Sequence, residues 1–114
     1  MKIFVVDDSN VIRRTATKIL EAAGHEVSAA GDGYEALAAI AGFRPDVIFM
    51  DVSMPRLDGY QACEIIRKSP CRNARIILLS GNGGLHDVAH GRMAGANAYL
   101  QKPFTLEDLL GALN

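Results

Sequence analysis

The sequence predicts an α/β fold: a doubly wound, five-stranded parallel sheet with helices on both faces. Short apolar runs alternate with segments of helical periodicity along the whole 114 residues. The connections between them are short, which favours right-handed crossovers between parallel strands. Acids or a base follow three of the apolar runs directly, at Asp7-Asp8, Asp51 and Lys102. We therefore expect one domain over residues 1–114, close to the usual domain size.

The first half of the chain predicts the order strand, helix, strand, helix, strand. Continuous apolar runs of the kind buried on both faces of a sheet mark the strands. In chain order, these elements are expected over residues 3–7, 10–23, 26–30, 34–41 and 47–50. Ser9 or Asn10 can cap the first helix, and Gly24 and Gly42 should end the two helices. The side chains expected to face the sheet are Ile12, Ala16, Ile19, Leu20 and Ala23, then Tyr34, Leu37, Ala38 and Ala41.

The second half continues the same alternation. Its elements are expected over residues 59–68, 76–79, 85–94, 98–101 and 106–113, starting with a helix. Ala62, Ile65 and Ile66 should face the sheet, and the glycine-rich stretch 81–84 should be the most mobile loop. Thr105, with Asp108 three positions on, resembles a capping box. The last helix has only about two turns, so either it is unusually short or the chain was cut from something longer.

Composition argues against several classes of function. A net charge of −1 gives no basic excess for binding nucleic acid or a membrane surface. No run approaches the roughly 20 apolar residues of a membrane span, and the N-terminus lacks the apolar region of a signal peptide. Cys63 and Cys71 have no CxxC spacing, which favours free thiols over a disulfide or a metal role. We expect the protein to stay in the cytoplasm.

The charged residues after the strands should share one pocket. Parallel strands end at the same edge of a sheet, where open α/β sheets bind ligands. Like charges about 4 Å apart repel by roughly 4 kcal/mol at an effective dielectric near 20, so a cation must offset the acids. Mg²⁺ suits such oxygen ligands, because it takes one or two carboxylates and keeps a position for a phosphate oxygen. The pocket is interpreted as a magnesium-assisted phosphoryl site.

These residues resemble the phosphoacceptor receiver domains of two-component signalling, over essentially the whole chain. The motifs that carry the resemblance are Asp7-Asp8, Asp51, Met54-Pro55, Asp58-Gly59, Ser80 and Lys102-Pro103-Phe104. The resemblance implies a flavodoxin-like (βα)5 fold with strand order 2-1-3-4-5. It also implies a signalling domain that catalyses only its own phosphorylation and dephosphorylation. A histidine kinase or phosphotransfer domain would be its donor.

The resemblance further implies a role for each site residue. Asp51 would accept the phosphoryl group, and Lys102 would pair first with Asp51 and then with a phosphate oxygen. Mg²⁺ would be bound by Asp8 directly, by Asp7 through water, by Asp51 and by the backbone carbonyl of Ser53.

The resemblance extends to the output of the domain. Ser80 would donate its hydroxyl to the phosphate, and the ring of Tyr99 would move inward as the aromatic switch. The Lys102–Pro103 peptide bond is expected to be cis. The partner surface would be formed by residues 85–94, strand 98–101 and the last helix.

Several alternatives remain open. The rival functions are a flavin-binding protein, a phosphohydrolase with an aspartyl intermediate, and a receiver-like module that binds a partner without being phosphorylated. Asp7-Asp8 would repel a flavin phosphate, and Ser53 stands where such hydrolases usually have a second acid. His86 and His90 could offer two metal ligands, although a solvated face is favoured. Arg13-Arg14 could attract a phosphodonor or an acidic partner, or could simply be exposed.

Finer motifs resemble the regulators of type IV pilus twitching motility. They include Met54 to Gln61 with Cys63, Gly91-Arg92, and Leu109 to Ala112. A flagellar chemotaxis regulator, or a receiver severed from an output domain, is the alternative within the family.

Overall fold

The computed structural model describes residues 1–81 and 85–114, and side chains except those of residues 82–86. Most of the loop expected to be mobile, residues 81–84, therefore lies outside the described residues. The side chain of His86, one of the two candidate metal ligands, lies outside them as well.

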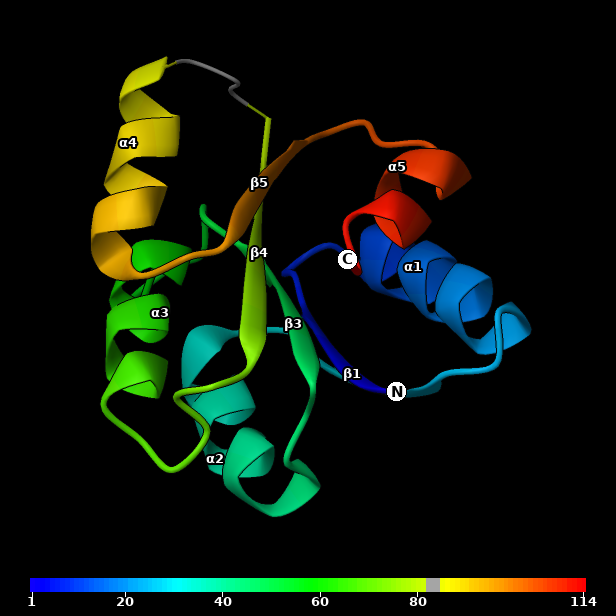
Figure 1. Ribbon diagram of the computed structural model, residues 1–114, viewed down its shortest axis with the longest axis horizontal. Helices are drawn as coiled ribbons and strands as arrows, with labels where there is room; N and C mark the ends of the chain where they lie inside the picture. The colour runs from blue at the N-terminus through cyan, green and yellow to red at the C-terminus, as the bar shows by residue number, and fades with distance from the viewer. Residues whose placement is uncertain (82–84) are drawn as a thin grey trace.

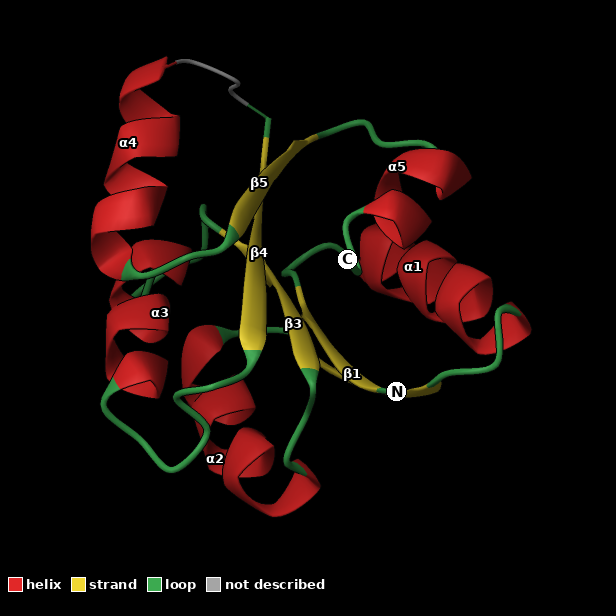
Figure 2. Cartoon of the chain, in the orientation of Figure 1, coloured by secondary structure: helices red, strands yellow, loops and turns green. Residues whose placement is uncertain are grey.

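Strands and helices alternate through the described chain. In order they are β1 (Lys2–Val6), α1 (Asn10–Ala22), β2 (Glu26–Ala30), α2 (Gly33–Phe43), β3 (Val47–Asp51), α3 (Gly59–Arg67), β4 (Arg75–Ser80), α4 (Leu85–Ala94), β5 (Ala98–Gln101) and α5 (Leu106–Gly111). Within the described residues, five strands form one parallel sheet in the order β2-β1-β3-β4-β5. Helices α1 and α5 lie on one side of it, and α2, α3 and α4 on the other (Figures 1 and 2). The predicted fold class and strand order are confirmed.

The central strands are buried on both faces, as their apolar sequences predict. Successive side chains of a strand point to opposite faces, so each strand contributes to two cores. Phe4, Ile48 and Leu78 pack on the side of α2, α3 and α4. Val5 and Phe49 pack on the side of α1 and α5. This double burial fixes the strand ends in space, and the site is built on those ends.

The apolar stripe expected for α2 is wrong except at Leu37, which is partly buried against the core. Ala36 and Ile40 are buried apolar residues of α2, whereas Tyr34 is 55% exposed. Ala38 and Ala41 are exposed as well. The sequence of this helix is apolar on nearly every side, so its periodicity carried little information about which face meets the sheet.

Four other details of the helices also differ. Ala23, expected to face the sheet, is exposed at the C-cap of α1. Gly42 lies inside α2, which ends one residue later, and Arg44 closes the helix in the left-handed region at φ 54°. Ile65 was expected to face inward but is 46% exposed, while Ala62 and Ile66 are buried. Helix α5 ends at Gly111, earlier than expected.

Helix caps set the positions where the site loops turn. The Ser9 side chain accepts a hydrogen bond from the Ile12 N–H and caps α1. Asp58 and Gln61 form a capping box at the start of α3. The capping box expected between Thr105 and Asp108 is present at the start of α5. These caps place the first turns of α1 and α3 close to the ends of β1 and β3.

Candidate functional site

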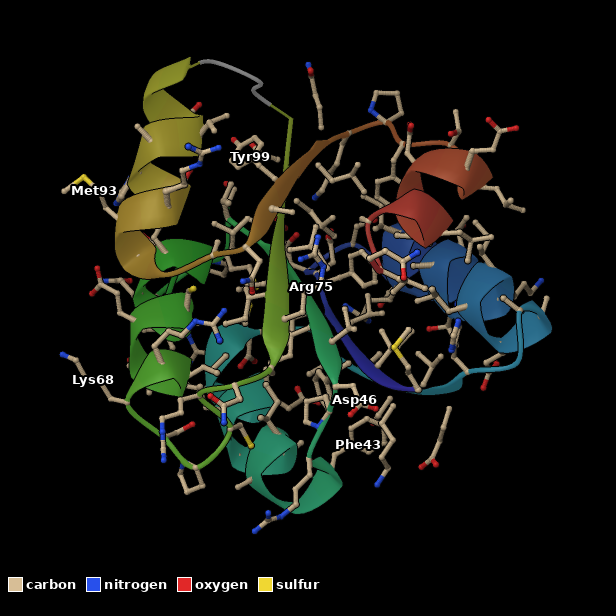
Figure 3. All side chains as sticks on the ribbon, viewed as in Figure 1. Phe43, Asp46, Lys68, Arg75, Met93 and Tyr99 are labelled. Carbon is tan, nitrogen blue, oxygen red and sulfur yellow. The ribbon has the colours of Figure 1, made fainter. Side chains whose placement is uncertain are left out.

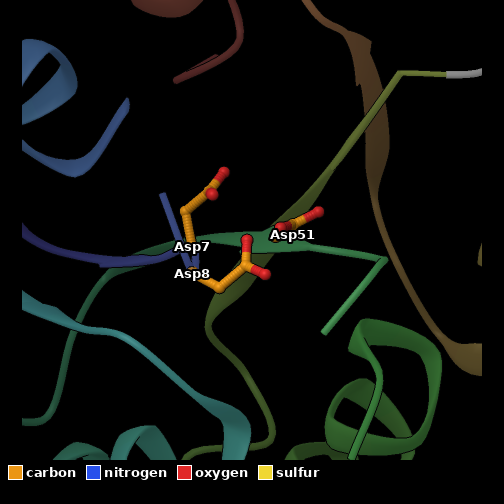
Figure 4. Close-up of side chains that lie close together, drawn as sticks. All are labelled: Asp7, Asp8 and Asp51. Atoms are coloured by element: carbon orange, nitrogen blue, oxygen red, sulfur yellow. The ribbon is translucent and has the colours of Figure 1, made fainter. Parts of the chain in front are cut away.

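Three carboxylates gather at the ends of β1 and β3, which are neighbours in the sheet. Oxygens of Asp7, Asp8 and Asp51 lie within 4.8 Å of one another. Figure 4 shows the three side chains together at this edge. Asp7 and Asp51 are 0% and 2% exposed, whereas Asp8 is exposed. The sequence predicted this cluster from its strand ends.

Each buried carboxylate is held by the backbone two residues further along the chain. The Ser9 N–H donates to Asp7 Oδ1 at 2.9 Å, and the Ser53 N–H donates to Asp51 Oδ1 at 3.1 Å. The guanidinium of Arg13 donates to the backbone oxygen of Asp7 and so ties α1 to the end of β1. The sequence suggested that Arg13 either attracts a partner or is simply exposed. This contact gives Arg13 a structural role as well. The position of both acids is therefore fixed by local turns.

Lys102 bridges the two buried acids. Its Nζ lies 2.8 Å from Asp7 Oδ2 and 3.2 Å from Asp51 Oδ1. Apart from this ion pair, the buried Asp7 Oδ2 has no hydrogen-bond partner among the described residues, so it keeps capacity for a further cation. The Lys102 N–H donates to the Ser80 carbonyl at 2.7 Å, and the Lys102–Pro103 peptide bond is cis. Lys102 directly follows β5, and its ammonium lies at the ends of β1 and β3.

The protonation of this cluster is set by burial and by charge. Burial raises the pKa of Asp51 to about 6, and the charge of Asp7 acts in the same direction. The Ser53 N–H and the Lys102 ammonium oppose this rise. Burial alone would lower the pKa of Lys102, but the carboxylates of Asp7 and Asp51 raise it overall. At neutral pH the cluster therefore combines a charged lysine with a carboxylate that can act as a nucleophile.

The donor set fits a hard divalent cation. Three carboxylates face one ammonium, so negative charge remains in excess. Oxygen ligands of this kind are preferred by Mg²⁺. The buried Asp7 Oδ2, with spare acceptor capacity, supports the same interpretation.

Ser80 lies at the end of β4 and is 4% exposed. It lines a cavity of about 580 Å³ together with Ser53, Met54, Tyr60 and Asp87. Tyr99 pairs with Leu78 in the sheet, two residues before Ser80 along β4. Sequence reasoning placed Ser80 correctly at a strand end but did not single out Tyr60. The available signal was the position of Tyr60 directly after the Asp58-Gly59 motif.

Comparisons with known proteins agree with this fold. The chain matches the family described as response regulator receiver domain over residues 3–114. The chain belongs to this family. It is a phosphorylation-accepting response regulator domain, similar to protein PilG of Pseudomonas aeruginosa and to chemotaxis protein CheY4 of Vibrio cholerae. Receiver domains act with histidine kinases and with output partners.

The similarity to these proteins extends over nearly the whole chain. PilG is 49% identical over 114 residues, which are 99% of this chain and 84% of PilG. Response regulator MprA of Mycobacterium avium is 42% identical over 113 residues, but the receiver spans only 49% of MprA. The structure of CheY4 superimposes with a TM-score of 0.94 at 38% identity, covering 98% of this chain and 94% of that one. In the parts described here, no helix of the receiver has both the length and the apolar character needed to cross a membrane.

Proposed function

We propose that residues 1–114 act as one receiver domain in which Asp51 accepts a phosphoryl group from a histidine kinase or a phosphotransfer domain. The observation that carries the proposal is the position of Asp51. Its carboxylate is buried at a central strand end, has a pKa of about 6 and lies 3.2 Å from the Lys102 ammonium. A carboxylate is an established nucleophile for phosphoryl groups.

The transfer uses the two oxygens of Asp51 differently. Oδ1 accepts the Ser53 N–H and pairs with Lys102, which leaves Oδ2 to attack phosphorus. The new bond joins Asp51 Oδ2 to phosphorus, the bond from phosphorus to the donor nitrogen breaks, and the donor imidazole leaves. Lys102 keeps its proton and exchanges Asp51 for a phosphate oxygen. Its compact ammonium suits this exchange better than a planar guanidinium would.

Mg²⁺ is proposed to be held by Asp8 directly, by Asp7 through water, by Asp51 and by the Ser53 carbonyl. When bound, the ion supplies charge neutralisation for the acids and for the incoming phosphate. The Asp7 and Asp51 carboxylates keep their positions through the backbone bonds from Ser9 and Ser53. The chain thus presents its oxygen ligands already ordered.

The output follows from Ser80 and Tyr99. The Ser80 hydroxyl donates to the phosphate in the phosphorylated state only, and a ligand shifts an equilibrium only through such differential contacts. Tyr99 then moves toward the space that Ser80 leaves. The partner surface is formed by α4, β5 and α5. We assign the receiver to a chemotaxis-like or type IV pilus motility pathway in the cytoplasm, as a signalling domain without further enzymatic activity.

Intact-mass spectrometry tests the proposal directly. Incubation with acetyl phosphate and Mg²⁺ should add one phosphoryl group to the wild type. Asp51→Asn should add none, because the amide is not a nucleophile for phosphorus. A phosphorylated Asp51→Asn protein would show that another residue is the acceptor.

A further inference from the structure

Tyr60 connects two helices on the side of the sheet that carries α3 and α4. It stands in the first turn of α3 and is half-buried. Its ring stacks on the imidazole of His90 in α4, with ring centroids 3.8 Å apart and an angle of 9° between the planes. His90 is exposed, as the favoured expectation of a solvated face had it, and it has this aromatic partner as well.

Tyr60 also contacts Tyr99 of β5. The phenols of the two tyrosines interact, since Tyr99 raises the pKa of the Tyr60 phenol both as a hydrogen-bond partner and through its charge. A Cβ atom on Gly91 of α4 would lie 3.7 Å from Tyr99 Cδ2 and 3.9 Å from Tyr60 Cε1. Both rings therefore lie against α4 at a point where the helix has no side chain. Figure 3 shows Tyr99 between α4 and β5.

Tyr60 also lies beside the proposed phosphoryl site. Tyr60 and Ser80 line one cavity of about 580 Å³, at the end of β4. Tyr60 is thus placed between the residue proposed to sense the phosphate and the ring proposed to respond. Its contacts join the first turn of α3 with the middle of α4 and with β5.

The phenol of Tyr60 keeps its proton over the physiological pH range. Burial, the hydrogen bond with Tyr99 and the carboxylates of Asp87 and Asp58 raise the pKa of Tyr60 to about 12. The hydroxyl group is therefore available as a hydrogen-bond donor whenever Tyr99 is beside it.

We propose that Tyr60 is a positioning residue of the Tyr99 switch, whose hydroxyl holds Tyr99 half-buried against α4 and whose ring is kept in place by the stack on His90. The functional meaning of this inference rests on the proposed function, because Tyr99 is a switch only if Asp51 is phosphorylated. The position of Tyr99 itself can be measured without phosphate.

Tyr60→Phe is the informative change, because it removes the hydroxyl and keeps the ring that stacks on His90. In some molecules the Tyr99 ring has left its position against α4. Loss of one net hydrogen bond should raise the fraction of such molecules by about 2- to 10-fold. Photochemically induced nuclear polarisation of tyrosine rings measures this exposure. The sequence has three tyrosines and no tryptophan, and Tyr34, at 55% exposed, is the internal reference.

Two further variants complete the design. Tyr34→Phe removes an exposed phenol from α2 and should leave the Tyr99 signal unchanged. His90→Ala removes the stack but not the hydroxyl, and should raise the Tyr99 signal less than Tyr60→Phe does. Thermal melting establishes that each variant is folded. Equal Tyr99 signals in the wild type, Tyr60→Phe and His90→Ala would overturn the inference.

Phosphorylation separates this inference from the proposed function. If wild-type Asp51 accepts no phosphoryl group, the proposed function fails whatever Tyr99 does. If the wild type is phosphorylated and its Tyr99 signal changes, the change should be at least about 2-fold smaller in phosphorylated Tyr60→Phe, which starts from a less docked ring. An identical change in both proteins would reject Tyr60 as part of the switch.

Discussion

Gly59 lies directly against the backbone of Asp51. A Cβ atom on Gly59 would be 2.3 Å from the Asp51 carbonyl oxygen and 2.8 Å from the Cα of Val52. The Gly59 N–H donates to the Val52 carbonyl at 3.1 Å, so the first turn of α3 is fastened to the end of β3. The close approach explains why a glycine stands here although its φ is not in the left-handed region.

Gly59→Ala should therefore be strongly destabilising. The added methyl group meets backbone atoms, which cannot move aside as a flexible side chain would. We expect the free energy of unfolding to fall by about 3 kcal/mol, measured by urea denaturation.

Gly42→Ala is the matched control, since nothing lies within 4 Å of a Cβ atom there. Gly42 lies inside α2, where alanine should stabilise by about 0.5–1 kcal/mol. Equal effects of the two substitutions would contradict the role given to the Asp51 contact.

The stability of the receiver should depend on pH through Asp51. Its pKa is raised from 3.8 to about 6 on folding, so the unfolded chain loses the proton first as the pH rises. Between about pH 4 and 6 the folded state binds more protons, and stability falls with rising pH by on the order of 2–3 kcal/mol. Below about pH 4 Asp51 is protonated in both the folded and the unfolded state, so this loss of stability is absent.

Other groups titrate in the same range, so the test compares the wild type with Asp51→Asn at each pH. Measured by denaturation in a metal chelator, the advantage of Asp51→Asn should grow between pH 4 and 6 and stay constant above. Adding Mg²⁺ should reduce that advantage, because the cation favours the charged carboxylate. A pH-independent difference would show that Asp51 titrates normally.

Asp8→Ala should abolish both Mg²⁺ binding and phosphorylation, because it removes the exposed carboxylate of the cluster. Without metal, the same change should leave the fold at least as stable as the wild type, since it relieves repulsion between like charges. Mg²⁺ titration and thermal melting measure the two effects. Glu64→Ala removes an exposed acid of α3 and should change neither. Undiminished Mg²⁺ affinity in Asp8→Ala would exclude Asp8 as a ligand.

Ser80→Ala should separate phosphorylation from output. Asp51 should still accept the phosphoryl group, because Ser80 is not its nucleophile. NMR shifts on phosphorylation over α4, β5 and α5 should be much smaller than in the wild type. If the phosphorylated wild type perturbs only the loops around the pocket, the partner must recognise the phosphoryl group itself.

The strand ends of the site could be predicted because they depend on local patterns. A buried apolar run followed by an acid fixes both the strand and the edge where Asp7 and Asp51 meet. The contact of Gly59 with Asp51 could not be predicted, since it depends on how α3 docks on β3. The stack of Tyr60 on His90 joins residues 30 positions apart and has no local signal.

Arg67 fastens α3 to the turn between α4 and β5. Its guanidinium donates to the carbonyl oxygens of Arg72, Ala74 and Gly95 at 2.7, 2.6 and 2.8 Å, and to Asn97 Oδ1 at 2.7 Å. Gly95 has φ +103°, and a Cβ atom there would lie 2.8 Å from Arg67 Cγ. The Arg67 side chain thus links the C-terminal end of α3 to the residues just before β5.

Arg67→Lys should not be a conservative change. The side chain of lysine ends in a single nitrogen. It cannot donate at the same time to the separate acceptors that the planar, forked guanidinium reaches. We expect a loss of about 3 kcal/mol in the free energy of unfolding, because several acceptors lose charged hydrogen bonds. Amide exchange should accelerate at residues 95–97, while Asp51 still accepts phosphate. Arg72→Ala is the control, because Arg67 uses only the backbone carbonyl of Arg72. Wild-type stability and exchange in Arg67→Lys would show that the positive charge alone, and not the fork of hydrogen bonds, holds this turn.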